Sequence, residues 1–202
     1  MKSINNYIFE KLVINKNAGK IGYAYFPKTK DELQDIIKQR IKKEGNECDL
    51  NDIDVSKITD MSNIFFESEF NGDISKWDVS NVEDMSCMFA GSEFNQDISG
   101  WDVSNVENME GMFNYSAFNQ DISKWDVSKV KTMESMFNNS DFNQDISDWN
   151  VSNVEDMEYM FYGSKFSQNI SKWDVRNTLY MMGIFDYSPL KGKEKEWWNI
   201  QN

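Results

Sequence analysis

The chain repeats a short polar segment whose side chains could bind a metal ion. The segment FNQDIS begins at Phe94, Phe118 and Phe142, and it returns as FNGDIS at Phe70 and as FSQNIS at Phe166. Its Asn and Asp side chains offer the hard oxygen ligands that Ca²⁺ prefers, but the spacing of an EF-hand loop is absent. The glycine-rich nonapeptide of calcium-binding β-rolls is absent too. We therefore favour a structural ladder, which pairs turn amides and carbonyls that would otherwise be buried without partners. The predicted ladder comprises Asn71, Asn95, Asn119, Asn143, Asp73, Asp97, Asp121 and Asp145.

A second repeated segment, KWDVS, offers carboxylates in an outward-facing column. Its alternation of polar and apolar residues, with Trp and Val inward, predicts a short strand that carries the Asp on its outer face. Parallel strands lie about 4.8 Å apart, and neighbouring carboxylates at that spacing repel by about 1 kcal/mol in water. Lys side chains on the same face could neutralise part of this charge, and a cationic partner the rest. The predicted partner-binding residues are Asp54, Asp78, Asp102, Asp126, Asp174, Lys76, Lys124, Lys172 and Arg176.

The same polar side chains have a purely local interpretation. Asp and Ser in DVSN can hydrogen-bond the nearby backbone as Asx- or ST-turns. We prefer this interpretation for the Ser column, which runs from Ser56 to Ser152 and ends in Arg176. For the Asp column, both interpretations remain open.

The composition argues against an enzyme. The chain has no His, which removes the usual general acid–base group and the commonest transition-metal ligand. Cys48 and Cys87 lie 39 positions apart without a CxxC partner, so zinc-binding and thioredoxin-type motifs are both missing. The many carboxylates single out no acid–base pair. We expect no catalytic residue, no metal site and no cofactor.

Apolar residues recur every 24 residues without insertion or deletion. Within one unit, the spacing ΦxxΦxΦ matches the leucine-rich-repeat template, whose units are 20–29 residues long. KWDVS predicts a strand, and VEDMSCMF, with apolar residues three or four apart, predicts a helical turn or short helix. The predicted fold class is an α/β solenoid, a leucine-rich-repeat-like right-handed coil of six 24-residue units with an N-terminal α+β cap. Its predicted core columns include Trp77, Trp101, Trp125, Trp149 and Trp173.

Both ends of the chain depart from the period. Residues 1–48 predict a cap: YIFEKLVINKNAGKIGYAYF reads as a β-hairpin, and PKTKDELQDIIKQRIKKEG as a helix. Thr29 and Glu32 suit a capping box at the start of this helix, and Gly45 suits its end. The solenoid is expected over residues 49–186, followed by a C-terminal cap or tail over 187–202. Terminal repeats need such caps. The helix face expected to cover the first coil is made by Leu33, Ile36, Ile37 and Ile41.

The repeats carry most of the negative charge. The whole chain has a formal charge of −13, and residues 49–186 hold 26 acidic and 8 basic residues, a net −18. Residues 1–48 are net +4 and residues 187–202 net +1. Binding to phosphates is driven by Lys and Arg, so direct nucleic-acid binding is disfavoured. A cationic partner fits this charge better.

The repeat resembles that of a known bacterial family. The pattern MxxMFxxSxFNQDISxWDVSNVxxM, over about residues 50–185, is similar to the repeat of the BspA-type bacterial surface proteins and mycoplasma lipoproteins, a leucine-rich-repeat-like family. The resemblance implies a solenoid used for binding, often at a cell surface, without enzymatic activity.

The expected function is therefore a non-enzymatic interaction module. Its acidic strand face would bind a protein or peptide with a basic surface, and the chain would be a monomer or an end-to-end dimer. The alternatives are a DNA mimic that inhibits a nucleic-acid-binding protein, and a calcium-stabilised structural rod. No membrane span of about 18 apolar residues is present. Without a signal peptide or lipid-attachment Cys the sequence suggests a cytoplasmic location, whereas the resemblance suggests the cell surface.

Overall fold

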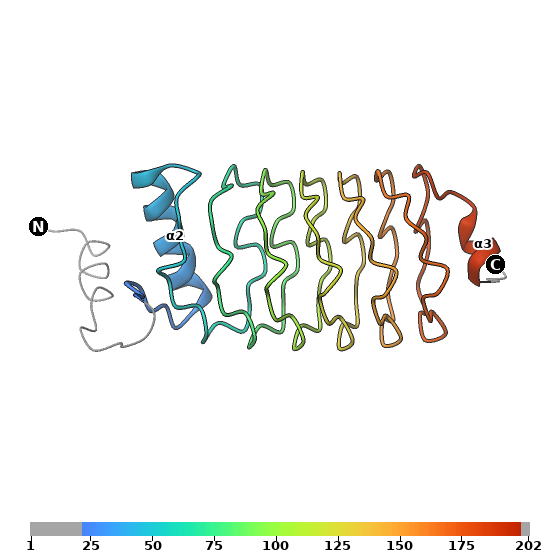
Figure 1. The fold of residues 1–202 in the computed structure, drawn as a ribbon, viewed down its shortest axis with the longest axis horizontal. Helices are drawn as coiled ribbons and strands as arrows, with labels where there is room; N and C mark the ends of the chain where they lie inside the picture. Colours follow the sequence, from blue (N-terminus) through green and yellow to red (C-terminus); the bar gives the residue numbers. More distant parts are fainter. Residues whose placement is uncertain (1–21, 199–202) are drawn as a thin grey trace, which may run out of the picture.

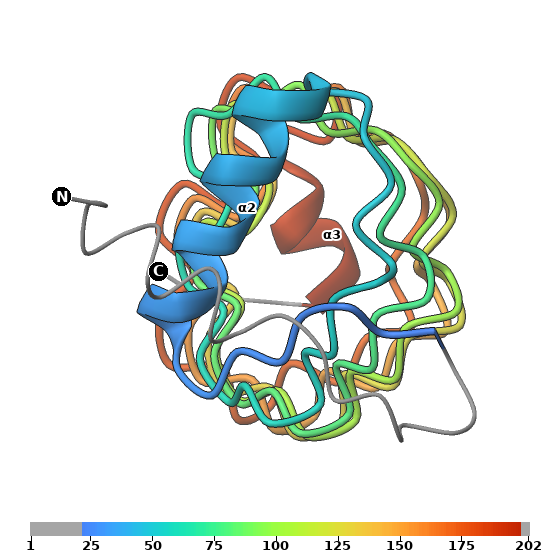
Figure 2. The same ribbon diagram turned by 90° about the vertical axis from the view of Figure 1, so that its left-hand side faces the viewer.

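Stacked 24-residue coils form a rod, and in the described part of the chain a helix lies at each end of the stack. The computed structural model describes residues 22–198. Helix α2 (Lys30–Glu44) lies at the N-terminal end of the stack, and the short helix α3 (Lys193–Trp198) lies at the C-terminal end (Figure 1). Viewed along the rod, successive coils follow nearly the same outline, so equivalent residues form columns (Figure 2).

The predicted α/β solenoid is wrong, because the coils contain neither strands nor helices. Within residues 22–198, the only helices are α2 and α3, and β-pairing is limited to isolated parallel bridges. One bridge joins Tyr25 to Ile53, and the others join equivalent residues of successive coils. That second series runs through Asp60, Asp84, Asn108, Thr132, Asp156 and Tyr180.

Consecutive tight turns take the place of the predicted short helix. In VEDMSCMF, the Cys87 N–H donates to the Glu110 carbonyl of the next coil at 2.7 Å. The next N–H, that of Met88, instead donates three residues back to the Met85 carbonyl at 3.2 Å. Alternate amides therefore pair between coils and within a turn. The apolar spacing of three or four residues arises from these i to i+3 turns, and not from the i to i+4 bonds of a helix.

KWDVS also forms turns instead of a strand. The Trp77 N–H donates to the Ile74 carbonyl at 3.1 Å, and the Val82 N–H donates to the Val79 carbonyl at 2.9 Å. These local bonds use amides that a strand would direct to its neighbours. The alternating inward and outward side chains survive, but the ladder of a sheet does not form.

Aromatic and Met side chains fill the interior in columns. Phe89 and Phe113 stack with ring centroids 5.7 Å apart, and the Trp77 and Trp101 rings stack at 6.5 Å. The five repeat Trp side chains are only 3–4% exposed. Each indole N–H also donates to a buried carbonyl of the preceding coil, as Trp125 does to Ile98 at 3.2 Å. The Trp column thus supplies both apolar packing and a bond between coils.

Helix α2 closes the N-terminal end of the stack. Its N-cap is Thr29, whose Oγ accepts from the Glu32 N–H at 3.2 Å, while the Glu32 carboxylate accepts from the Lys28 N–H at 2.7 Å. The N–H of Gly45 (φ 91°) donates to the Ile41 carbonyl at 2.8 Å and ends the helix. The predicted helix is therefore present. Its residues Leu33, Ile36 and Ile37 are buried, and Ile41 is partly buried against the core.

An arginine joins this helix to the first coil. Arg40 is only 8% exposed, and its guanidinium binds both carboxylate oxygens of Asp52 (2.7 and 2.9 Å) and the Glu44 carboxylate (2.9 Å). It also donates to the Asp49 carbonyl at 2.9 Å and lies 5.2 Å from the centre of the Tyr25 ring. Burial opposes its charge, but the bonds to Asp52 and Glu44 prevail and raise the pKa of Arg40.

The chain ends show two further features. Most of the predicted β-hairpin lies outside the described residues, and so does the last part of the predicted C-terminal tail. Within residues 22–198, no helix has the length and apolar character needed to cross a bilayer.

A local clash explains the departure of FNGDIS from FNQDIS. Gly72 stands where the later coils have Gln, and a Cβ at this position would lie 2.1 Å from the Cys48 carbonyl oxygen. The backbone that follows α2 therefore leaves no room at residue 72 for a side chain like that of Gln96, the equivalent residue of the next unit.

We expect Gly72→Ala to lower the free energy of unfolding by about 1–3 kcal/mol, because backbone must move to admit the methyl group. Gly100→Ala is the matched control, since its Cβ would meet nothing within 4 Å. Urea unfolding of both variants measures the difference. Equal stabilities would contradict the close contact between Gly72 and Cys48.

Candidate functional site

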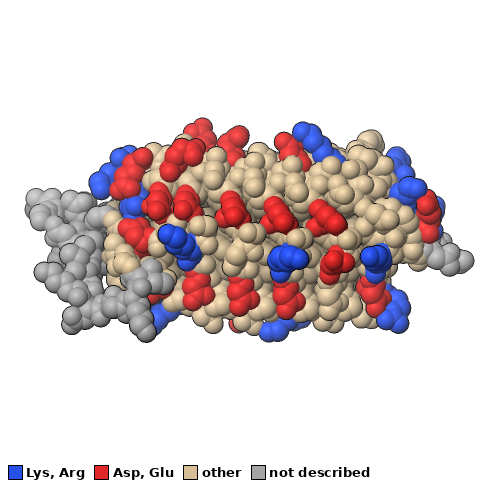
Figure 3. Space-filling model, in the orientation of Figure 1, with Lys and Arg blue, Asp and Glu red and all other residues tan. Residues whose placement is uncertain are grey.

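Charged side chains form three parallel rows on one face of the rod (Figure 3). We call this surface the acidic face. Its outer rows are acidic, and the row between them is mixed. The first row contains Asp73, Asp97, Asp121 and Asp145; the middle row Lys76, Lys124, Asp148 and Lys172; and the third row Asp78, Asp102, Asp126 and Asp174. A shallow pocket of 300 Å³ lies between the rows, where Asp121, Lys124, Asp145 and Asp148 contribute to its lining.

The third row is built by Asx-turns in the WDVS segments. The Asp102 carboxylate accepts the Ser104 N–H at 3.1 Å, and Asp126 accepts the Ser128 N–H at 3.0 Å. Asp78 accepts both the N–H and the hydroxyl of Ser80, at 3.2 and 2.6 Å. Asp54 has the same local bonds in the first coil. The Asp side chains therefore have the structural role that the local interpretation gives them, while their carboxylates stay at the surface.

The first row is also built by Asx-turns, in which each Asp of FNQDIS accepts a hydrogen bond from the Ser two residues later. Asp97 accepts the Ser99 N–H at 2.9 Å, and Asp121 accepts the Ser123 N–H at 2.8 Å. These Asp side chains were predicted to form part of a stacked ladder together with the Asn residues. The structure instead gives them partners within their own coils.

The Asn residues of FNQDIS do bond from coil to coil. The Asn95 Oδ1 accepts the Asn119 N–H at 2.9 Å, and the Asn119 Oδ1 accepts the Asn143 N–H at 2.8 Å. The same pattern begins at Asn71 and ends at Ser167. Gln144 adds a bond from its amide nitrogen to the Asn119 Oδ1 at 3.1 Å. This column satisfies backbone amides that the turns leave without carbonyl partners.

A second Asn column was not identified from the sequence. It lies in WDVSN, where the side-chain amide of each Asn donates to a Ser carbonyl in the preceding coil. The Asn105 Nδ2 lies 2.7 Å from the Ser80 carbonyl, and the Asn153 Nδ2 lies 2.7 Å from that of Ser128. The 24-residue recurrence of this Asn was visible in the sequence, with Lys57 and Lys129 as the exceptions. It could have been read as a second ladder.

Hydrogen bonds from Ser favour the ionised carboxylates. They lower the pKa of Asp102 and Asp126 in the third row, and of Asp97, Asp121 and Asp145 in the first. The Arg176 side chain lowers the pKa of Asp174 to about 2. At neutral pH these carboxylates are therefore charged and held in fixed positions.

Little of this charge is neutralised by direct ion pairs. Among the described residues, the third row has one ion pair, between Asp174 and Arg176 at 2.6 Å. Lys76, Lys124 and Lys172 lie in the middle row but form no ion pair within residues 22–198. The structure therefore brings the predicted Asp and Lys residues onto one face without pairing them.

In residues 22–198, no group of three or more Cys, Asp or Glu side chains is placed to hold a metal ion. Burial raises the pKa of the Cys48 and Cys87 thiols, which disfavours the nucleophilic thiolate. What the acidic face can do is attract and position positive charge.

The chain belongs to a family of mycoplasma repeat proteins. It matches the family model described as "Mycoplasma protein of unknown function, DUF285" over residues 32–141 and 114–198. These two matches cover most of the chain, and the family is of the BspA and mycoplasma repeat type. No curated protein and no solved structure matches the chain.

We expect Asn119→Ala to destabilise the protein by about 1–3 kcal/mol, because the Asn143 N–H loses its acceptor in a partly buried place. Asn119→Asp is the matched control, since it keeps an oxygen at the same position. Urea unfolding of both variants near neutral pH measures the effect. If alanine were no more harmful than aspartate, the Asn column would not stabilise the stack.

The first-row Asp residues also predict a pH dependence. Their pKa is lower in the folded chain than the ordinary 3.8, so they stabilise the fold above 3.8 and this contribution is lost as the pH falls through their folded values. The triple variant Asp97→Asn, Asp121→Asn and Asp145→Asn should therefore lose less stability on acidification. Asn169 shows that Asn can hold this turn, because it accepts the Ser171 N–H at 2.9 Å.

Urea unfolding at several pH values from neutral to below 3.8 tests this expectation. The control variant Glu67→Gln, Glu69→Gln and Glu93→Gln removes the same charge from exposed positions elsewhere on the coils. An equal flattening of the pH dependence in both variants would assign the effect to total charge and not to the Asx-turns.

Proposed function

We propose that this member of the DUF285 family is a non-enzymatic binding module whose acidic face binds a protein or peptide with a basic surface. The observation that carries the proposal is that the fold does not require the charge of the Asp rows. Asn150 stands in the third row and accepts the Ser152 N–H and hydroxyl at 3.2 and 2.7 Å, as Asp78 does with Ser80. An Asn would therefore build each of these turns without electrostatic repulsion.

The charge that remains is available to a partner. The Asp102 and Asp126 carboxylates accept from Ser104 and Ser128, and neither carboxylate has an ion-pair partner among the described residues. Both side chains are exposed, and both are ionised at neutral pH because their pKa is lowered. Immobile carboxylates lose little entropy when they bind a cation, which favours association with Lys or Arg.

The middle row supports selectivity. Its successive residues are Lys76, Gly100, Lys124, Asp148 and Lys172, so positive side chains interrupt the negative surface at alternate coils. A partner with uniform positive charge would meet these Lys residues unfavourably. A basic surface with gaps, or with acidic residues at the matching spacing, would bind in one register.

A DNA mimic is the second candidate, and it rests on the same observation. Regular rows of fixed carboxylates along a rod resemble the charge pattern of a nucleic-acid backbone, which a nucleic-acid-binding protein could accept. Competition separates the two functions, because duplex DNA displaces a mimic from its target but leaves a dedicated protein contact in place.

The triple variant Asp78→Asn, Asp102→Asn and Asp126→Asn tests the acidic face without disturbing its turns. We expect unchanged unfolding and about tenfold or more weaker binding to a Lys/Arg-rich probe peptide, because three unpaired charges are lost. The Glu67→Gln, Glu69→Gln and Glu93→Gln variant removes the same total charge elsewhere and should bind nearly as tightly as the original. Titration calorimetry at low and moderate salt, with and without duplex DNA, measures both.

If the two triple variants bound the peptide equally well, binding would follow net charge and the proposed site would be wrong.

A further inference from the structure

The last coil ends in a row of backbone donors that have no acceptors in the described part of the chain. At the preceding junction, the N–H groups of Met157, Tyr159 and Phe161 donate to the carbonyls of Tyr180, Met182 and Ile184 at 2.8–3.0 Å. Earlier junctions show the same bonds, so this is the regular way in which one coil holds the next. One coil later, the equivalent donors have no acceptor among residues 22–198. These donors are the N–H groups of Met181, Gly183, Phe185 and Tyr187.

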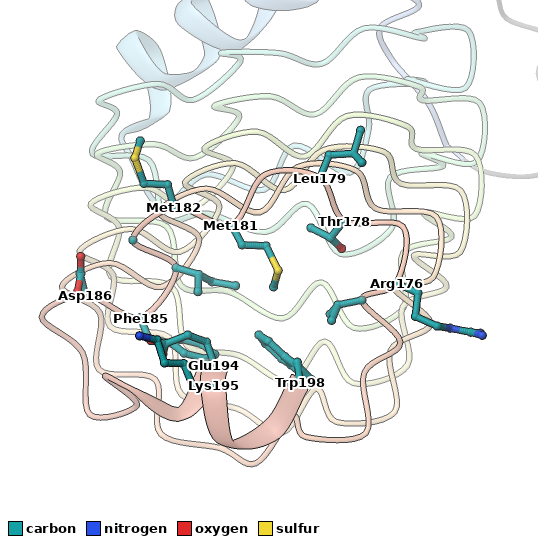
Figure 4. A pocket seen from close by; sticks show the side chains of 13 residues that line it. Arg176, Thr178, Leu179, Met181, Met182, Phe185, Asp186, Glu194, Lys195 and Trp198 are labelled. Carbon is teal, nitrogen blue, oxygen red and sulfur yellow. The ribbon is translucent and has the colours of Figure 1, made fainter. Parts of the chain in front are cut away.

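The side chains at this end are also left uncovered. A pocket of 590 Å³ opens into the end of the last coil, with Met181, Ile184, Phe185 and Trp198 among its lining residues (Figure 4). Met157 and Met133, which precede Met181 in its column, are fully buried, whereas Met181 is only partly so. The Met column therefore ends at a partly open surface, whereas Ile184 and Phe185 of the same coil stay buried.

Exposed apolar residues form the rim of this pocket. Leu179 is 71% exposed and Met182 is 58% exposed, and both belong to the lining. Large apolar side chains exposed next to an open pocket are typical of a docking surface.

Two polar side-chain atoms in the same pocket also lack partners. The Trp198 Nε1 and the Glu194 Oε2 are buried, and neither has a hydrogen-bond partner in the described part of the chain. Buried polar atoms without partners are costly, and most such atoms in native proteins are paired. An occupant that accepts from the indole and donates to the carboxylate would satisfy both.

The two ends of the stack are closed to different degrees. At the N-terminal end, α2 has 15 residues and buries Leu33, Ile36 and Ile37 against the first coil. At the C-terminal end, α3 has six residues, none of them buried, and its Trp198 reaches the Phe185 ring at 5.6 Å. The helix α3 therefore covers only part of the last coil.

The direction of the backbone restricts what can bind there. Along residues 181–186 every carbonyl accepts a hydrogen bond and the unpaired backbone groups are donors, so two copies meeting end to end through this segment would face donor to donor. The matching free carbonyls, those of Asp60, Ser62 and Ile64, lie at the other end of the stack beside α2. Lys30 of that helix binds the Asp60 carboxylate at 3.0 Å and also contacts the Ser62 hydroxyl. A second copy therefore cannot supply these carbonyls unless α2 moves.

We propose that the open C-terminal edge is a docking site for an extended segment of a partner polypeptide, which lies parallel to residues 181–187. Carbonyls at every second residue of the segment accept from the free amides, and an apolar Met- or Phe-like side chain enters the pocket. The interior junctions provide the pattern, because the carbonyls of Thr132, Glu134 and Met136 accept in this way from the coil before them. Addition of a strand-like segment to an open backbone edge is a known mode of peptide recognition.

The test uses the full chain and a synthetic peptide, KTMESMFNNS, which has the sequence of residues 131–140. We expect the amides of Met181, Gly183 and Tyr187 to exchange rapidly in the free protein and to become protected when the peptide is added, whereas the amide of Phe185, a residue only 2% exposed, should already exchange slowly. Hydrogen exchange followed by NMR measures each amide. A peptide with the same residues in scrambled order should protect none of them.

Two variants keep the test independent of folding. Leu179→Glu and Met182→Glu change exposed residues at the rim, and each should weaken peptide binding about tenfold or more, because the bound peptide would have to cover a charge beside the pocket. Phe66→Glu is the control, since it adds the same charge at a position 48% exposed in the first coil. Unfolding curves verify that all three variants remain folded.

Several outcomes would overturn the proposal: no protection at saturating peptide, protection elsewhere on the coils, or equal binding by the scrambled peptide. A concentration-dependent increase in mass of the chain alone, abolished by Leu179→Glu, would also overturn it and assign this edge to a second copy. The acidic face is not involved in this test, so its result is independent of the function proposed for that face.

Discussion

The structure depends on which of two carbonyls each backbone N–H donates to, one in the next coil or one three residues back in the same turn. In the turn segments, alternate N–H groups donate to the next coil, and those between them donate three residues back. The chain thus satisfies its backbone with tight turns and with contacts between coils, without a continuous sheet or helix. This pattern repeats only if equivalent residues lie above one another, so it requires the constant period of 24 residues. An inserted residue would move every later column out of register.

This backbone pattern places unusual demands on two positions in each coil. They have φ values between 50° and 65°, where glycine is favoured. The first series is Asn63, Cys87, Gly111, Ser135, Tyr159 and Gly183, and the second is Glu67, Gly91, Tyr115, Asn139, Gly163 and Tyr187. Glycine and Asn occupy about half of these positions, as the conformation predicts. The Tyr residues do not follow from the backbone requirement, but Tyr159 and Tyr187 pack edge-on against the Tyr162 ring, with centroids 5.8 and 5.0 Å away.

The sequence predicted those features that depend on residue type at a fixed spacing. The 24-residue period, the buried Trp column and the helix from Lys30 to Glu44 all follow from apolar recurrence or capping residues. The segments KWDVS and VEDMSCMF were misread because apolar spacing alone does not reveal which carbonyl accepts each amide. Repeated i to i+3 turns and a short helix bury side chains at nearly the same spacing. Residues with positive φ occur in the repeated turns and not in a helix. Cys87, Ser135 and Tyr159 adopt positive φ, but their residue types do not predict it.

In the candidate site too, the sequence predicted which residues form columns, but not which hydrogen bonds they make. The Asp and Asn columns were evident from the sequence, but their bonding directions were not. Asp97 and Asn95 are two residues apart in one segment. The Asp97 carboxylate nevertheless accepts a hydrogen bond from its own coil, whereas the Asn95 side-chain oxygen accepts one from the next coil. The turn needs only one acceptor oxygen, and Asn150 and Asn169 supply it as well as Asp does. Negative charge retained at the other positions opposes stacking, because like charges repel along the column. The hydrogen bonds from Ser outweigh this repulsion, since the pKa of Asp97 and Asp102 is lowered in the fold, and a positively charged partner would remove the repulsion that remains.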